Sequence, residues 1–282
     1  MVQFRLSAFA DELSPEIDRQ IEWLTSRGLD LLEIRGVDGT PVADITLEKA
    51  REVKEKLDRA GVGISAVGSP AGKIGINDDF GPHLEQFRHL CDICDILGAK
   101  RMRIFSFFMP DGEDPASYRG EVMRRLGEFV RIASERGITL CHENEKGIYG
   151  DTPERCADIY NEFGGVIKNV FDHANYISCG VEPYPHAFSL VGRGLSHMHI
   201  KDANVAAEMV PAGEGIGRIP ETLDALRGLY DGEFILTLEP HLMEFSGLKG
   251  LEKEGHTSNL GNRYASPEAA FDCALAALKK YL

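Results

Sequence analysis

Short apolar runs alternate with longer segments of helical periodicity along the whole chain. The runs are typical of strands, and the longer segments repeat apolar residues every three or four positions. The predicted strands are residues 4–9, 31–34, 64–68, 102–107, 138–143, 167–172, 195–202 and 233–240. The predicted helices are residues 14–28, 47–61, 82–98, 114–137, 152–164, 186–194, 219–230 and 266–282. We expect Ser14 to be the N-cap of the first helix.

This alternation predicts a (β/α)₈ barrel, the TIM barrel, formed by residues 1–282 as a single domain. The strands read as continuous apolar runs, which suits a parallel sheet buried on both faces better than an antiparallel one. The alternative is an open, doubly wound sheet, which should carry a glycine-rich phosphate fingerprint after its first strand. Residues 8–16 read AFADELSPE there, so the barrel is favoured.

Composition and charge narrow the range of partners. The chain has 282 residues, 43% hydrophobic and 27% charged, which is typical of a globular protein with a large core. Its apolar runs are too short to span a membrane, and its first residues turn acidic, so we expect neither membrane insertion nor secretion. The formal net charge of −14 speaks against a nucleic-acid partner. We therefore expect a cytoplasmic protein.

The six cysteines are scattered, and only Cys91 and Cys94 form a C-x-x-C pair. That pair lies inside the predicted helix 82–98, and no second pair follows in the sequence to complete a zinc site. We interpret both residues as buried thiols in a reducing compartment, in preference to a redox motif.

Acidic and imidazole side chains stand at the ends of four successive predicted strands. Glu143 ends the fifth strand, Asp172 the sixth and Glu239 the eighth, and His199 stands near the end of the seventh. In a TIM barrel the carboxyl ends of all strands meet at one rim, where active sites form. Converging buried carboxylates repel one another unless a cation neutralises them. The pattern therefore predicts one divalent ion bound by these four residues.

The donor types also indicate which ion is bound. Three carboxylates and one imidazole make a mostly oxygen site, which suits Mn²⁺ or Mg²⁺ and tolerates Zn²⁺ or Co²⁺. The alternative is that strand-end acids are solvated or cap the following helices, and for a single residue this would be the better explanation. Four such residues at consecutive strand ends favour the metal site.

Other polar residues near the same rim are candidates for substrate binding. Of Glu33 and Arg35, at the end of the second strand, we expect only Glu33 to point into the barrel mouth. Arg103 either reaches the rim or forms a structural ion pair. The remaining candidates are Lys73, His142, Glu145, Asn175, Lys201 and His241.

Two glycine-containing loops are candidate ligand sites. The loop 68–74 contains Lys73, a candidate for a substrate phosphate or carboxylate, but its spacing is one residue short of a phosphate-binding P-loop. The loop 211–217 either lets backbone approach a ligand closely or forms tight turns.

Several short motifs carry a resemblance to a known family. They read HEN at 142–144, FD at 171–172, HIKDA at 199–203 and LEPHL at 238–242, with early matches at 7–14, 31–36, 68–74 and 103–108. In these the chain resembles the sugar phosphate isomerase/epimerase family of xylose isomerase-like TIM barrels, within the AP endonuclease 2 superfamily. The resemblance implies that a Glu, an Asp, a His and a Glu from strands five to eight bind one metal ion.

One position departs from the family pattern. Several ketose epimerases of the group place a substrate-contacting histidine three residues after the aspartate ligand, where this chain has Asn175. His173 stands between. The departure speaks against ketose 3-epimerase activity.

The expected reaction is isomerisation or epimerisation of a sugar, sugar phosphate or inositol-derived keto substrate through an enediolate. Glu143 and Glu239 would exchange protons with the substrate, while Asp172 and His199 would mainly hold the metal. Dehydration of an inosose-type substrate at the same site is the alternative. An abasic-site endonuclease with several zinc ions and a non-catalytic sugar-binding barrel are less favoured. The expected partner is a small carbohydrate, and assembly into a homo-oligomer is left open.

The segment 245–264 has no strong helical period and is longer than usual connections. Because it follows the last strand, it would stand at the catalytic rim, where we expect it to act as a functional cover.

Overall fold

The computed structural model describes residues 1–245, 259–260 and 264–282. The proposed cover over the rim falls mainly on residues 246–258 and 261–263, which lie outside the described residues.

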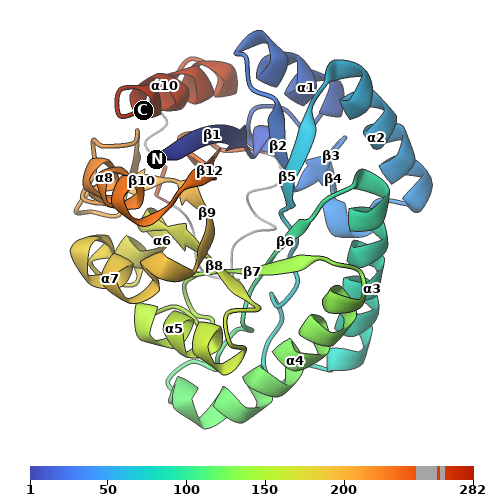
Figure 1. Cartoon of the computed structure of the whole chain (residues 1–282), viewed down its shortest axis with the longest axis vertical. Helices are drawn as coiled ribbons and strands as arrows, with labels where there is room; N and C mark the ends of the chain where they lie inside the picture. The colour runs from blue at the N-terminus through green and yellow to red at the C-terminus, as the bar shows by residue number, and fades with distance from the viewer. Residues whose placement is uncertain (246–258, 261–263) are drawn as a thin grey trace.

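Eight parallel strands form a nearly closed barrel, which confirms the predicted fold (Figure 1). The strands are β1 (Val2–Ala8), β2 (Leu31–Ile34), β5 (Gly63–Val67), β6 (Arg101–Ile104), β7 (Thr139–Glu143), β8 (Lys168–Asp172), β9 (Leu195–Ile200) and β12 (Gly232–Leu238). Their hydrogen-bonded order is β1-β12-β9-β8-β7-β6-β5-β2, and β1 and β2 contact each other to complete the ring. All carboxyl ends therefore point to the same rim.

Helices surround the ring of strands on its outer side (Figure 1). They are α1 (Ile17–Ser26), α2 (Leu47–Ala60), α3 (Phe80–Leu97), α4 (Arg119–Glu135), α5 (Pro153–Glu162), α6 (His173–Ser178), α7 (Phe188–Val191), α8 (Ile219–Leu229) and α10 (Pro267–Lys279). Capping explains several of the ends. The Thr46 side chain accepts from the backbone N–H of Lys49 at the start of α2, and Gly61 ends that helix in the left-handed conformation.

Three local features differ from the sequence prediction. Helix α1 begins at Ile17, so Ser14 is not its N-cap, and the Ser14 hydroxyl instead accepts from the N–H of Glu16. Helix α6 begins directly after β8, because the Asp172 side chain caps it by accepting from the N–H of Asn175. The short antiparallel pairs β3 (Gly36–Val37) with β4 (Thr40–Pro41), and β10 (Asp202–Ala203) with β11 (Met209–Val210), were not predicted.

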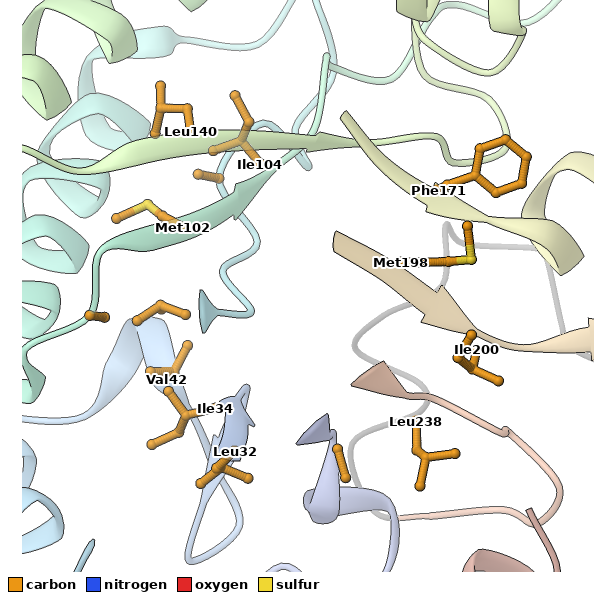
Figure 2. Packing of buried hydrophobic residues seen from close by; sticks show 14 of the residues in the cluster. Leu32, Ile34, Val42, Met102, Ile104, Leu140, Phe171, Met198, Ile200 and Leu238 are labelled. Carbon is orange, nitrogen blue, oxygen red and sulfur yellow. The ribbon is translucent and has the colours of Figure 1, made fainter. Parts of the chain in front are cut away.

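Neighbouring residues on each strand face opposite sides of the sheet, and the two sides differ in character. Apolar residues such as Ile104, Leu140 and Met198 belong to one buried cluster that includes the helices (Figure 2). Between them stand polar residues that are also buried: Glu33, Arg103, Glu143, His197, His199 and Thr237. One face of the strands is thus apolar, whereas the other mixes these polar residues with buried apolar ones such as Val170 and Ile235, and the expected continuous apolar runs are interrupted there.

Cys91 and Cys94 are buried free thiols on α3, as predicted. Burial raises the pKa of Cys91 to about 12, which leaves it an unreactive thiol at neutral pH. Among the helices of the described residues, none combines the length and the apolar character needed to cross a membrane.

Candidate metal centre

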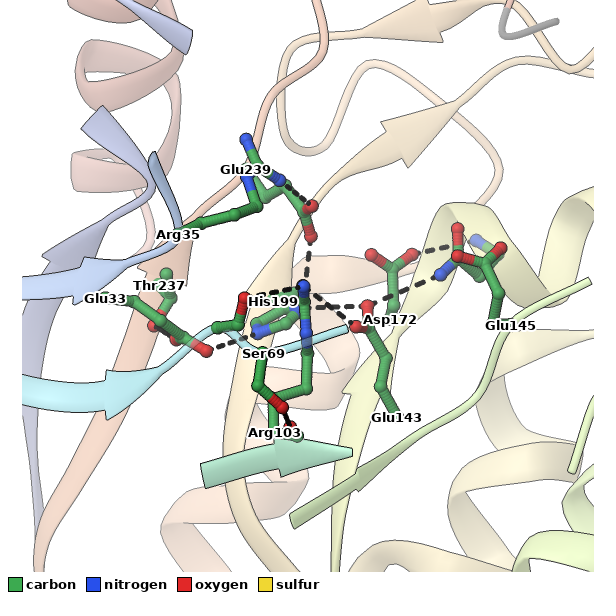
Figure 3. A network of polar contacts seen from close by, with 12 residues as sticks. Glu33, Arg35, Ser69, Arg103, Glu143, Glu145, Asp172, His199, Thr237 and Glu239 are labelled. Atoms are coloured by element: carbon green, nitrogen blue, oxygen red, sulfur yellow. Dashed lines mark hydrogen bonds and ion pairs between the residues drawn. The ribbon is translucent and has the colours of Figure 1, made fainter. Parts of the chain in front are cut away.

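Four of the predicted site residues converge at the carboxyl-end rim of the barrel (Figure 3). Glu143 ends β7, Asp172 ends β8, His199 lies on β9, and Glu239 follows the last residue of β12. One ligand atom from each lies within 4.8 Å of those of the other three, and all four residues are buried. We call these four residues the main group. As a set they could hold a metal ion.

His199 stands at the centre of the main group and is held from both ring nitrogens. Its Nδ1 lies 2.9 Å from Glu143 Oε1 and 3.0 Å from Glu239 Oε2. On the other side of the ring, Nε2 lies 3.4 Å from Glu33 Oε1, and the Thr237 hydroxyl donates to the other Glu33 oxygen at 2.8 Å. Glu33 is fully buried. Its position therefore suits a group that orients His199, and not the substrate contact expected from the sequence.

An arginine holds the second oxygen of each glutamate in the main group. Arg103 Nη1 lies 3.3 Å from Glu143 Oε2, and Arg35 Nη1 donates to Glu239 Oε1 at 2.8 Å. The Phe9 ring contacts both guanidinium groups, at 4.3 Å from Arg35 and 5.1 Å from Arg103. The exclusion of Arg35 from the barrel mouth was wrong, because residues two apart on a strand face the same side.

Two asparagines brace the strand ends that carry Glu143 and Asp172. The Asn144 side chain donates to the carbonyl of Asp172 and accepts from its N–H, both at 2.9 Å. The Asn175 side chain donates to the carbonyl of Asn144 at 2.9 Å and approaches Glu143 Oε1 at 3.4 Å. Asn175 therefore faces the main group and is engaged there with protein atoms.

Burial and charge shift the pKa values of the group in opposite directions. Burial raises the pKa of Asp172 to about 7, and the nearby carboxylates add to this rise while the Lys201 ammonium opposes it. Lys201 Nζ lies 3.0 Å from Asp172 Oδ2 and 3.7 Å from Glu239 Oε2. Burial alone would also raise the pKa of Glu239, but Lys201 and His199 hold it well below its usual range.

Buried carboxylates outnumber the buried arginine and lysine side chains around the main group. The carboxylates are Asp11, Glu12, Glu33, Glu143, Asp172 and Glu239, and the arginines and lysine are Arg35, Arg103 and Lys201. Against the effect of burial, the carboxylates also raise the pKa of His199 well above its usual range. Among the described residues, Asp172 Oδ2 and Glu239 Oε2 are buried and accept no hydrogen bond of good geometry, and their charged neighbours are Lys201 and His199, each at 3.0 Å. Buried charge that is only partly compensated is costly, and a divalent cation would reduce the carboxylate excess. The donor set therefore fits a divalent ion.

Lys73, Glu145 and His142, also predicted to bind substrate, contact other residues of the protein. Lys73 donates to Glu145 at 3.1 Å, and Lys73 Nζ also lies 4.4 Å from the centre of the Phe105 ring. His142 adjoins Glu143 on β7 and so faces the opposite side of the strand, where it bonds to the Ser106 hydroxyl at 2.9 Å. His142 is therefore fully buried and faces away from the main group, and its substrate contact stays a prediction.

The Asp202 side chain holds the glycine-rich loop 211–217 in place. The N–H groups of Gly213 and Gly217 donate to the Asp202 carboxylate at 2.9 Å, and that of Gly215 at 3.2 Å. A Cβ atom on Gly215 would lie 2.3 Å from Asp202 Oδ1, so the close approach requires glycine there.

Sequence reasoning missed several residues of this site. Asp11 and Glu12 follow β1 at the same rim and accept hydrogen bonds from Arg35. The Phe9 and His199 rings pack in a T-shaped arrangement, with their centroids 5.1 Å apart. A signal was present, because an acidic pair directly after the first strand obeys the same strand-end rule as the four ligands.

Comparison with known proteins gives one family and a set of solved structures. A family model described as the xylose isomerase-like TIM barrel matches residues 21–257. An IolI protein solved with a bound zinc atom has a TM-score of 0.74 at 16% identity, covering 99% of both chains. D-psicose 3-epimerase from Clostridium cellulolyticum H10, solved with D-tagatose, has 0.70 at 17% identity, covering 98% of both.

A third similar structure is the probable 3-DHS dehydratase AsbF from Bacillus anthracis. Its TM-score is 0.69 at 16% identity, and the match covers 84% of this chain and 92% of that chain. At such identities the likeness shows the fold alone. Comparison with curated proteins gives no match.

Proposed function

The chain belongs to the family of xylose isomerase-like TIM barrels, and from this premise we propose that it is a metal-dependent isomerase or epimerase. Its substrate is a sugar, a sugar phosphate or an inositol-derived ketone. The observation that carries the proposal is the convergence of Glu143, Asp172, His199 and Glu239 within 4.8 Å at the rim where TIM-barrel active sites form.

The four residues of the main group would hold one divalent ion. Three carboxylates and one imidazole favour Mn²⁺ or Mg²⁺, and Zn²⁺ is supported by the zinc atom of the IolI structure. Such an ion polarises a bound carbonyl group and stabilises negative charge that develops on its oxygen. Glu33 orients His199 from behind, through its contact with Nε2.

Glu143 and Glu239 are the proposed proton carriers. Positively charged neighbours hold the pKa of each below its usual range despite burial, so both are ionised at neutral pH and can accept a proton. One glutamate takes the proton from the carbon beside the substrate carbonyl, which leaves an enediolate. Return of a proton to the opposite face of that carbon gives an epimer, and return to the adjacent carbon gives an isomer.

Dehydration is the second candidate, favoured by the placement of Asn175. Its side chain is engaged with Asn144 and Glu143, at the position where ketose epimerases of the family present a histidine to the substrate. In a dehydration the same first proton is removed, and the β-hydroxyl group then leaves with a proton as water. The similarity to AsbF, a probable dehydratase, is compatible with this alternative.

Metal analysis combined with a substrate panel tests the proposal. We expect the purified protein to contain one divalent ion per chain, and a chelator to abolish turnover of a ketose, aldose or inosose in the panel. Restoration by Mn²⁺ or Mg²⁺ would support the assignment. Retention of several zinc ions would favour the endonuclease, and full activity after chelation would contradict metal dependence.

A further inference from the structure

Glu239 belongs to a second cluster of potential ligands beside the main group. This adjoining group consists of Glu12, Glu239 and His241, all buried, with one ligand atom of each within 4.8 Å of the others. Glu239 directs Oε2 at His199 in the main group and Oε1 at His241 in the adjoining group. Its two oxygens therefore face two different sets of donors, as in a carboxylate that bridges two metal ions.

The His241 ring is directed at the two carboxylates of the adjoining group. Its Nε2 lies 3.3 Å from Glu12 Oε1 and 3.5 Å from Glu239 Oε1. Only 5% of the residue is exposed, and within the described residues this nitrogen makes no hydrogen bond. The backbone of His241 has φ 46°, and its N–H donates to Glu12 Oε2 at 3.0 Å. An uncommon backbone conformation thus holds the ring in place.

The Arg35 guanidinium group donates hydrogen bonds to the same carboxylate oxygens of Glu12 and Glu239. Arg35 Nη1 donates to Glu239 Oε1 at 2.8 Å, and Nη2 donates to Glu12 Oε1 at 3.3 Å. Its Nε and Nη2 bind the two oxygens of Asp11 at 2.9 and 3.1 Å. The arginine is thus the cation that neutralises the adjoining group. It competes for the ligand oxygens and would repel a second ion beside it.

We propose that Arg35 takes the place of a second divalent ion. The wild-type chain then binds an ion only in the main group, and loss of the positive charge at position 35 creates a site at Glu12, Glu239 and His241. Without Arg35, the carboxylates of Asp11, Glu12 and Glu239 would remain buried without their cation, which is a strong drive for metal binding. The expectation that the wild type binds one ion rests on the proposed function. The expectation that loss of the Arg35 charge adds an ion does not.

The test compares bound Mn²⁺ in four proteins after equilibration and removal of free metal. Arg35→Met removes the charge and keeps an unbranched side chain, and Arg35→Lys is the matched control that keeps the charge. The double variant Arg35→Met, His241→Ala removes the imidazole ligand as well. We expect one additional ion per chain in Arg35→Met relative to wild type. We expect no additional ion in Arg35→Lys or in the double variant. Electron paramagnetic resonance should detect coupling between neighbouring Mn²⁺ ions only in Arg35→Met.

The difference in bound metal between Arg35→Met and wild type tests the inference. The number of ions bound by the wild type tests the proposed function. Equal metal content in Arg35→Met and wild type would overturn the inference, as would a second ion in wild type. A wild type that binds no ion would contradict the proposed function, while a His241-dependent gain in Arg35→Met would still support the inference. If Arg35→Met does not fold, Arg35→Gln replaces it with the same expectation, because Gln keeps hydrogen-bond donors without the charge.

Discussion

The two glutamates of the main group have matching surroundings. Each directs one oxygen at His199 Nδ1, and an arginine holds its other oxygen. This arrangement keeps both carboxylates ionised, although burial alone would favour their neutral forms. It also places two potential bases beside the same imidazole nitrogen, where two proton transfers could be served by different carboxylates.

Replacing either glutamate by glutamine should separate metal binding from proton transfer. Glu143→Gln and Glu239→Gln keep the size and one oxygen donor but remove the base. We expect kcat to fall by roughly 10²–10⁴-fold with most of the metal retained. Glu85→Gln, on the exposed surface of α3, is the control. Near-normal turnover in both site variants would rule out these proton carriers and direct attention to Glu145, Lys201 and His241.

His199 and His197 provide a second matched pair. His197 lies two residues earlier on β9 and contacts Glu33 Oε2 at 3.4 Å, outside the main group. Loss of an outer partner of a metal ligand typically costs 10–100-fold in affinity. We expect His199→Ala to weaken Mn²⁺ binding by more than this range and His197→Ala to stay within or below it, measured by calorimetric titration. The reverse order would identify His197 as the ligand.

The residue-level errors have identifiable physical causes. The convergence of the four residues of the main group was predictable because each stands at or near the end of a parallel strand. Arg35 was excluded and His142 included although strand alternation predicts the opposite for both. The pairing of Arg35 with Asp11, Glu12 and Glu239 depends on side chains from three separated segments, which periodicity along one strand cannot reveal.

Among the elements, the junction of β8 and α6 has the most direct bearing on the site. Asp172 ends the strand and caps the helix, since Oδ1 accepts from the N–H of Asn175 at 2.8 Å, and Oδ2 is left facing Lys201. A residue that is both a cap and a potential ligand leaves little freedom for its carboxylate. The sequence did not predict α6, because the six-residue helix is too short to show a clear period.

Asn144 should contribute to stability through the same junction. Asn144→Ala removes two buried hydrogen bonds and leaves the N–H and carbonyl of Asp172 without that partner. We expect the free energy of unfolding to fall by about 1–3 kcal/mol in urea denaturation. Asn161→Ala, at an exposed position of α5, should change it by less than about 0.5 kcal/mol. Equal effects of the two substitutions would refute the bracing role of Asn144.

Helix α3 carries a buried histidine that should make stability depend on pH. His83 Nε2 accepts from the N–H of Gly72 at 2.7 Å, and burial, with Arg125 nearby, lowers the His83 pKa to about 4. In the unfolded chain the usual histidine pKa is about 6.5. As pH falls between these values, the unfolded state binds a proton that the folded state does not, so stability is lost.

The His83→Gln variant isolates this contribution. Gln can still accept the Gly72 hydrogen bond but does not titrate. We expect the slope of unfolding free energy against pH, between about pH 6 and 4.5, to decrease by up to roughly 1.4 kcal/mol per pH unit. Identical slopes in the variant and wild type would show that His83 is not held neutral in the folded state.

At the scale of the whole molecule, the barrel explains why the residues of the main group, far apart in sequence, meet. Glu143, Asp172, His199 and Glu239 come from adjacent strands in the order β7, β8, β9 and β12, whose carboxyl ends share one rim. Both the barrel and the family were predictable, because eight repeating units and motifs along the chain pointed to them. The substrate was not, since substrate choice depends on individual rim side chains rather than on the repeating pattern.

The proposed role of the main group and its ion is to assist removal of a proton beside a substrate carbonyl. The most direct measurement is incorporation of deuterium from heavy water at that carbon, followed by nuclear magnetic resonance for the ketoses and inososes of the panel. We expect incorporation with the metal-loaded protein, loss of incorporation on chelation, and recovery when Mn²⁺ or Mg²⁺ is restored. Incorporation that continues unchanged after chelation, or substrate turnover by the metal-loaded protein with no deuterium at the carbon, would contradict it.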